Sequence, residues 1–221
     1  MGMKSAILLF SGGQDSTACL GWAINNFDRV LAVSYFYGQN HKNELDFSSK
    51  IANKLNIEQR VIDISFYSGL INSALTSHGD LNQKHRDHKN LPSSFVPNRN
   101  HLFILIAHSI AQTLGYKNII IGASQSDYSG YPDCRNIFIR SLEGVLNLGS
   151  EVNIKILTPL MFLNKAQIFS LAESNGVLDI VVNDTMTCYS GDTTKNEWGM
   201  GCGHCPSCKL RKSGYIDFKK S

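Results

Sequence analysis

The first side chains that could do chemistry lie near the N-terminus, in the stretch Ser11-Gly-Gly-Gln-Asp-Ser16. An apolar run over 6–10 precedes it and a helical pattern over 17–24 follows it. A strand that turns through glycines into a helix directs several backbone N–H groups, and the positive end of the helix dipole, at one place. The glycines permit a close approach, and the serine hydroxyls add donors. The stretch predicts a phosphate site, although not of the Walker type, which needs a lysine. The alternative is an ordinary tight turn.

A metal site is predicted near the other end, where four of the six cysteines lie. Cys202, Cys205 and Cys208 recur every three residues, and Cys188 precedes them by thirteen intervening residues. Thiolates in this arrangement can complete the tetrahedral coordination of structural zinc. An iron–sulfur cluster is the first alternative, but ferredoxin motifs continue with a cysteine where Lys212 stands here. Free thiols are the second alternative.

Three other residues bear on that prediction. His204 could replace one thiolate, although its place inside the knuckle makes it the less favoured ligand. Cys19 lies in the first helical pattern and is expected to be a small core residue. Cys134 belongs to a motif near the middle of the chain and could be a covalent nucleophile.

The composition describes a chain that folds around a sizeable core. It has 221 residues, of which 43% are hydrophobic, enough for one α/β domain with a small appendage. The net charge of +3 argues against a strongly basic nucleic-acid surface. We find neither the roughly 18 consecutive apolar residues of a membrane helix nor a signal-peptide pattern. We therefore expect a cytoplasmic protein, in which cysteines serve metal binding or catalysis.

Strand-like and helical patterns alternate along the chain. Strands are predicted over 6–10, 30–35, 60–64, 118–122 and 154–158. Helices are predicted over 17–24, 45–55, 101–114, 137–148 and 165–175. This alternation predicts a doubly wound α/β fold, with a mostly parallel sheet and helices on both faces. The polar stretch 76–97 has no clear periodicity and is a mobile active-site flap, a disordered insertion or simply a solvated loop.

Four further stretches add to the loop and the cysteines. They are Tyr37-Gly-Gln-Asn-His41, Val96-Pro-Asn-Arg-Asn100, Ser129-Gly-Tyr-Pro-Asp-Cys-Arg135 with Asp127 before it, and Thr187-Cys-Tyr189. The whole set resembles the 7-cyano-7-deazaguanine (preQ0) synthase family of the ATP pyrophosphatase, or PP-loop, superfamily, from Lys4 to about Tyr215. Asn98 stands where that family usually has glycine, and asparagine tolerates left-handed φ better than most residues.

The resemblance implies an adenine nucleotide alpha hydrolase-like fold and an ATP-dependent carbon–nitrogen ligase of queuosine biosynthesis. The family converts 7-carboxy-7-deazaguanine and ammonia to the nitrile through an adenylated carboxylate and an amide, and releases AMP and diphosphate. The resemblance further implies Mg²⁺, one structural Zn²⁺ and a homodimer, with no direct nucleic-acid or membrane partner. We expect a nucleotide-binding domain over 1–186 and a zinc-knuckle region over 187–221 packed on it.

The resemblance also implies which residues bind ATP. They are Phe10, Ser11, Gly12, Gly13, Gln14, Asp15, Ser16, Thr17, Ala18, Cys19 and Leu20. Asp15 and Ser16 are assigned catalytic roles, and Asp15 is a candidate ligand for Mg²⁺ at the phosphates.

Arginine and acidic residues are the candidates for the substrate and for further catalytic roles. Arg99 and Arg135 could clamp the substrate carboxylate or the α-phosphate, because guanidinium groups bind such anions bidentately. Asp127 and Asp133 could accept N–H groups from the guanine-like edge. Of these, Arg99, Asp133 and Arg135 are also catalytic candidates. The alternatives are a surface arginine and carboxylates that cap loops.

Gln39 and His41 complete the predicted substrate set. His41 could assist proton removal from ammonia, but a histidine in a loop is more often a simple hydrogen-bonding residue.

Two other functions stay open at this point. The first is a PP-loop enzyme that modifies tRNA, which should carry a basic surface or an extra domain. The second is a zinc-stabilised nucleotide sensor, which would bind ATP or AMP without turnover. Activity on the free base, on tRNA or on neither would separate the three.

Overall fold

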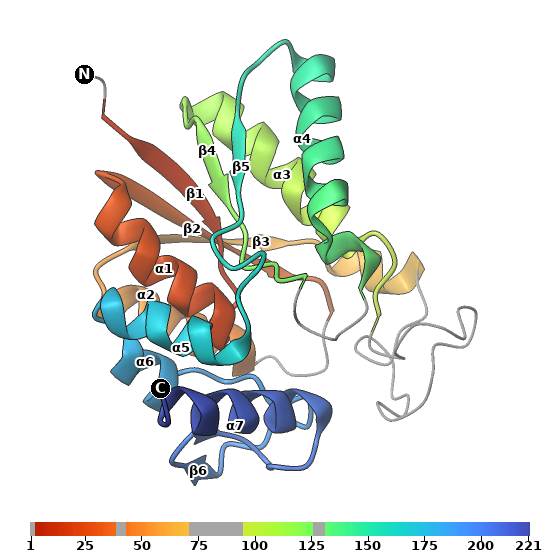
Figure 1. The fold of residues 1–221 in the computed structure, drawn as a ribbon. Helices are drawn as coiled ribbons and strands as arrows, with labels where there is room; N and C mark the ends of the chain where they lie inside the picture. The colour runs from red at the N-terminus through yellow and green to blue at the C-terminus, as the bar shows by residue number, and fades with distance from the viewer. Residues whose placement is uncertain (1–2, 39–42, 71–94, 126–130) are drawn as a thin grey trace.

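The computed structural model describes residues 3–38, 43–70, 95–125 and 131–221, and a five-stranded parallel sheet lies at its centre (Figure 1). The strand order is β3–β2–β1–β4–β5. The strands are β1 (Ser5–Leu9), β2 (Arg29–Phe36), β3 (Glu58–Asp63), β4 (Asn118–Ile120) and β5 (Lys155–Leu157). The chain winds outward from β1 to β3 and then returns to the other side of β1. The sheet therefore has a switch point between β1 and β4, which is where ligands bind in such folds.

The central strand β1 is buried on both faces, which explains its apolar sequence. Ala6 and Leu8 pack into one core cluster, whereas Ile7 and Leu9 pack into a second cluster on the opposite face. Successive side chains of a strand point to opposite faces, so a strand covered on both sides needs an unbroken apolar run.

Helices cover both faces, as the alternating pattern predicted. One face carries α1 (Gln14–Asn26), α2 (Asn43–Lys54), α5 (Lys165–Ser174) and α6 (Leu178–Asn183) (Figure 1). The other face carries α3 (Arg99–Leu114) and α4 (Asn136–Ser150). Short 3-10 helices span Ser65–Leu70 and Pro132–Cys134. The predicted fold class is confirmed. Within the described ranges, no helix has both the length and the apolar character needed to cross a membrane.

Several predicted boundaries were wrong by a few residues. Helix α1 begins at Gln14 instead of residue 17, and α3 begins at Arg99 instead of residue 101. Strand β4 ends at Ile120 instead of residue 122. The first turn of each helix is polar, so apolar periodicity begins only after the helix does. Most of the stretch 76–97 lies outside the described residues.

The C-terminal region contains elements that the sequence patterns did not predict. Helix α6 follows α5, and a short hairpin joins β6 (Lys195–Asn196) to β7 (Gly199–Met200). Helix α7 (Pro206–Phe218) begins inside the cysteine knuckle, and Phe218 packs into the core cluster that contains Ala6 and Leu8. The C-terminal helix is thus built into the core of the α/β unit. The domain boundary expected at 186/187 stays a prediction.

Candidate nucleotide site and cysteine cluster

A cavity of about 320 Å³ opens at the carboxyl ends of β1, β2 and β4, at the switch point of the sheet. From the predicted ATP loop, the residues that line it are Phe10, Ser11, Gly13, Gln14, Asp15 and Ser16. The later loop residues, Thr17, Ala18, Cys19 and Leu20, are buried in α1 and do not line the cavity. The structure therefore brings the first part of the predicted loop, but not its end, to the place where a ligand fits.

Ser16 closes the turn of the loop. Its Oγ accepts the N–H of Ser11 at 3.3 Å, donates to the carbonyl of Gly13 at 3.2 Å and lies 3.1 Å from Ser11 Oγ. Gly12 has a φ of +76°, and a Cβ there would lie 2.7 Å from the backbone nitrogen of Ser48 in α2. Conformation and packing both require glycine at this position. The loop is thus shaped in advance, as an anion site needs.

Asp15, the predicted magnesium ligand, pairs with a lysine that the sequence analysis did not single out. Lys165 Nζ lies 2.9 and 2.7 Å from the two carboxylate oxygens, and the two side chains are only 12% and 27% exposed. Lys165 is the first residue of α5, whose start is fixed by a capping box between Asn164 and Gln167. Lys165 thus places an ammonium group, paired with the Asp15 carboxylate, beside the anion loop.

Gln14 supplies a test of whether a ligand fits the cavity. Its side chain is 1% exposed and lines the cavity, yet within the described part of the chain neither amide atom has a hydrogen-bond partner. Leaving a buried amide unpaired costs about 1–3 kcal/mol, so a donor and an acceptor are available here to a bound molecule. Together with the preformed loop and the ammonium group of Lys165, this unpaired amide makes the site suitable for a nucleoside triphosphate.

Arg99 and aromatic side chains form the opposite wall. The Arg99 guanidinium lies 5.9 Å from the centroid of the Tyr37 ring, and the rings of Tyr35 and Phe103 stack at 4.2 Å. Burial by itself lowers the pKa of Arg99, but nearby acidic groups, namely the hydroxyls of Tyr37 and Tyr131 and the carboxyl of Asp133, outweigh burial and raise that pKa. Among the described residues, no ion pair joins Arg99 to a carboxylate. The cavity thus has a permanent cation facing the anion loop.

Asp133 is buried against α3 and does not line the cavity. Its carboxylate accepts the N–H of Asn100 at 3.3 Å, and Asn100 Nδ2 donates to the Asp133 carbonyl at 3.3 Å. Asn100, to which the sequence analysis assigned no role, does line the cavity, as does Cys134, whose Sγ lies 3.5 Å from Asn100 Nδ2. A role for Asp133 in substrate binding stays a prediction, and positioning Asn100 is what its contacts show.

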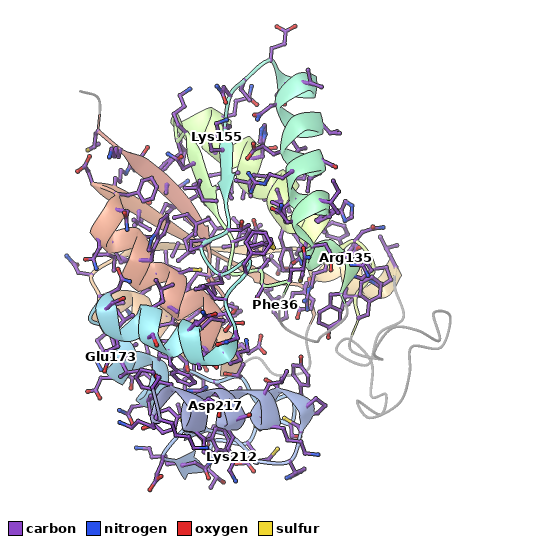
Figure 2. The ribbon with its side chains drawn as sticks, in the orientation of Figure 1. Phe36, Arg135, Lys155, Glu173, Lys212 and Asp217 are labelled. Atoms are coloured by element: carbon purple, nitrogen blue, oxygen red, sulfur yellow. The ribbon has the colours of Figure 1, made fainter. Side chains whose placement is uncertain are left out.

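The other predicted substrate residues are not brought to the cavity by the described structure. Arg135 is exposed (Figure 2), occupies the N-cap position of α4 without a side-chain capping hydrogen bond, and is not among the lining residues. Gln39, His41 and Asp127 lie outside the described residues.

The four predicted metal ligands come together. The Sγ atoms of Cys188, Cys202, Cys205 and Cys208 all lie within 4.8 Å of one another. The Cys188–Cys205 and Cys202–Cys208 Sγ distances are 4.0 and 3.9 Å, close to the edge of about 3.8 Å of a tetrahedron with metal–sulfur bonds of about 2.3 Å. The ring of His204 is exposed, with Nδ1 2.9 Å from the Cys202 carbonyl. The donor set fits one tetrahedral metal ion, and the clustering is confirmed.

The metal cluster and the cavity share one segment of chain. Thr187 and Tyr189 line the cavity on either side of Cys188. The sequence analysis quoted these two residues but assigned them no role. Residues 187–189 thus contribute both to the wall of the cavity and to the cysteine cluster.

The fold and the cavity define a doubly wound α/β protein with an anion loop at the switch point of its sheet, the arrangement expected of the ATP pyrophosphatase, or PP-loop, class. The fold is similar to that of NMN synthetase from Francisella tularensis, with a TM-score of 0.50 at 17% identity over 88% of this chain and 71% of that one. At this identity the likeness shows the fold alone.

Comparison of the sequence with known proteins assigns the chain to a particular family. The family described as "Queuosine biosynthesis protein QueC" matches residues 5–219, so the chain belongs to the QueC family. It is 50% identical to the 7-cyano-7-deazaguanine synthase of Wolinella succinogenes over 219 residues, which are 98% of this chain and 94% of that protein. It is 48% identical to the 7-cyano-7-deazaguanine synthase of Helicobacter pylori strain P12 over 222 residues, 99% of this chain and 97% of that protein. The family resemblance is confirmed.

Proposed function

We propose that the protein converts 7-carboxy-7-deazaguanine and ammonia to 7-cyano-7-deazaguanine at the expense of ATP. The observation that carries the proposal is a single cavity lined by both the anion loop and Arg99. ATP first transfers AMP to the carboxylate and releases diphosphate. Ammonia then displaces AMP to give the amide, and a second adenylation of the amide oxygen lets AMP leave as the nitrile forms.

The anion loop has to stabilise the negative charge that develops on the departing diphosphate in each of the two adenylation steps. The Ser16 hydroxyl holds the loop in place before the reaction, so backbone N–H groups at the start of α1 can stabilise the departing diphosphate without reorganising. Lys165 adds a positive charge beside them. Mg²⁺, when bound, would neutralise part of the negative charge on the phosphates. Asp15 is the residue that we propose to hold it, oriented by Lys165.

The opposite wall suits the second substrate. The Arg99 guanidinium can bind a carboxylate or the α-phosphate bidentately. Stacked Tyr35 and Phe103 offer flat apolar surface, which matches an aromatic heterocycle. Contacts from Gln39, His41, Asp127, Asp133 and Arg135 to the heterocycle remain part of the proposal. A closely held ammonia needs orientation and the loss of one proton, and no covalent nucleophile.

We further propose one structural Zn²⁺ on the four cysteines, because soft thiolates in tetrahedral arrangement select this metal. A cytoplasmic homodimer that acts on small molecules and contacts neither nucleic acid nor membrane completes the proposal. Light scattering of the purified protein tests the dimer.

The reaction is tested by mass spectrometry of zinc-replete protein with ATP, Mg²⁺, ammonium and 7-carboxy-7-deazaguanine. The nitrile together with AMP is the expected result. Amide without nitrile would refute the second adenylation. If no AMP forms, the ligase proposal fails, and tRNA is the next substrate to test.

A further inference from the structure

A buried arginine joins the C-terminal helix to the wall of the cavity. Arg211 of α7 is 1% exposed. Its Nε donates to the Trp198 carbonyl at 2.9 Å, its Nη1 to the Thr185 carbonyl at 3.3 Å and the Thr187 hydroxyl at 2.7 Å, and its Nη2 to the carbonyls of Val181 at 2.6 Å and Val182 at 3.4 Å. A guanidinium has five N–H donors, and all five are matched here.

The charge of Arg211 is balanced by carbonyl groups. In the ranges that the structure describes, no carboxylate forms an ion pair with it. Val181 and Val182 lie in the last turn of α6, where unpaired carbonyls form the negative end of the helix. Burial lowers the pKa of Arg211 to about 10, so the group stays charged at neutral pH. A lysine has neither the planar fork nor the number of donors to replace it.

Helix α7 holds Thr187 at its hydroxyl and at its backbone carbonyl. Arg211 Nη1 donates to the Thr187 hydroxyl at 2.7 Å, and Ser207 Oγ donates to the Thr187 carbonyl at 2.7 Å. Ser207 and Arg211 are four residues apart, so they project from the same face of the helix. The preceding carbonyl, that of Met186, borders the anion loop, because a Cβ on Gly13 would lie 3.5 Å from it.

We propose that Arg211 and Ser207 are positioning residues of the nucleotide site, which hold residues 186–189 against the anion loop. They touch no reacting atom and act through Thr187, which lines the cavity. This inference rests on the proposed function in one respect only, that the cavity binds ATP. Weakening either contact lets the wall move, so nucleotide affinity falls while the groups that perform the chemistry remain.

The test compares Ser207→Ala, Arg211→Lys and Thr187→Val with the double variant Arg211→Lys/Thr187→Val. The matched control is Lys212→Ala, an exposed position on the same helix (Figure 2). Calorimetry with a non-hydrolysable ATP analogue and Mg²⁺ gives Kd, and steady-state kinetics give KM for ATP and kcat. Metal content and melting temperature are measured on every variant.

Ser207→Ala and Arg211→Lys should each raise Kd and KM for ATP about fivefold, the worth of one hydrogen bond, with kcat within about twofold of the parent. The double variant should be less affected than the product of its two single changes, because both remove the same contact. Unchanged Kd in Ser207→Ala and Thr187→Val, even with lower melting temperatures, would make the contacts merely structural and overturn the proposal. These two conservative variants decide the question even if Arg211→Lys does not fold. Failure of the proposed reaction would appear instead as a parent protein that binds the analogue but makes no nitrile.

Discussion

Lys165 Nζ contacts both carboxylate oxygens of Asp15, and this pair joins the start of α5 to the start of α1. The C-terminal helix lies directly behind it, since a Cβ on Gly214 of α7 would lie 2.2 Å from Lys165 Cβ. Three elements that are distant in the sequence therefore meet at the acidic residue of the anion loop. The position of Asp15 depends on all three.

Replacing Lys165 by methionine should reduce kcat/KM for ATP about 100-fold. The change removes a charge beside the departing diphosphate, and loss of one such preorganised group costs 10²–10³ in rate in comparable sites, roughly. A pyrophosphate-release assay measures the effect. The control is Lys54→Met, which breaks the exposed Lys54–Asp184 pair and should leave the rate unchanged, because an exposed ion pair contributes little. Equal rates for the two variants would contradict a role for Lys165.

Ser16→Ala should lower the rate of diphosphate release by at least about tenfold while the protein stays folded. The Ser16 hydroxyl contacts both Ser11 and Gly13, so its loss relaxes the loop that must receive the phosphates. Near-parent melting with slow turnover is the expected pair of results. Ser170→Ala, on the exposed side of α5, is the control and should be silent. A fully active Ser16→Ala protein would mean that the loop is misinterpreted.

Cys205→Ser should release one equivalent of metal and lower the melting temperature. Three remaining thiolates bind a tetrahedral ion more weakly, and metal binding contributes to the stability of the C-terminal region. Elemental analysis by mass spectrometry gives the metal content. Cys134→Ser is the matched control, because Cys134 is not part of the cluster, and it should retain the metal. Retained metal in Cys205→Ser would refute the four-cysteine site.

Asn98→Gly should leave stability within about 0.5 kcal/mol of the parent, whereas Asn98→Val should cost about 1–2 kcal/mol. Asn98 has φ 57° and ψ 17° just before α3, so the expected left-handed turn does form. Valine, unlike glycine, is strained in that region. Chemical denaturation measures the difference, and Asn53→Val in α2 is the control without a positive φ. Similar losses for the two valine variants would contradict this account.

In metal-free protein at pH 7, iodoacetamide should modify Cys202 faster than Cys205 or Cys208. Burial opposes ionisation of Cys202, but the backbone N–H groups of Cys205 and His204 outweigh it and lower its pKa from 9.0 to about 6. Burial raises the pKa of Cys205 and Cys208. Because the folded pKa of Cys202 is depressed, its thiolate stabilises the metal-free fold fully above about pH 9. That contribution declines on acidification and is gone below about pH 6.

Peptide mass spectrometry gives the order of alkylation, and the Cys202 rate should fall as the pH drops through about 6. Earlier modification of Cys205 or Cys208 would reverse the assignment. Zinc binding at pH 7 should release protons from the thiols of Cys205 and Cys208. Calorimetry in buffers of different ionisation enthalpy detects this release.

The sequence by itself determined the features that depend on local spacing. Alternating apolar runs specify the parallel sheet, because a doubly covered strand such as β1 must be apolar throughout. The anion loop needs only consecutive residues 11–16, and three of the cysteines lie within one short turn. These features form through contacts close along the chain, so their spacing carries the information.

Only the tertiary structure decided which distant side chains serve the site. Lys165 and Asp15 are 150 positions apart, Asn100 and Asp133 are 33 apart, and Arg211 and Thr187 are 24 apart. A lone lysine at a helix start, or an arginine in a polar helix, has no distinctive spacing. Helix α7 was missed for the same reason, because its apolar contacts are supplied by α5 and not by its own periodicity. Such residues acquire their roles from burial and from neighbours that the folded chain brings together, and neither is encoded in local sequence.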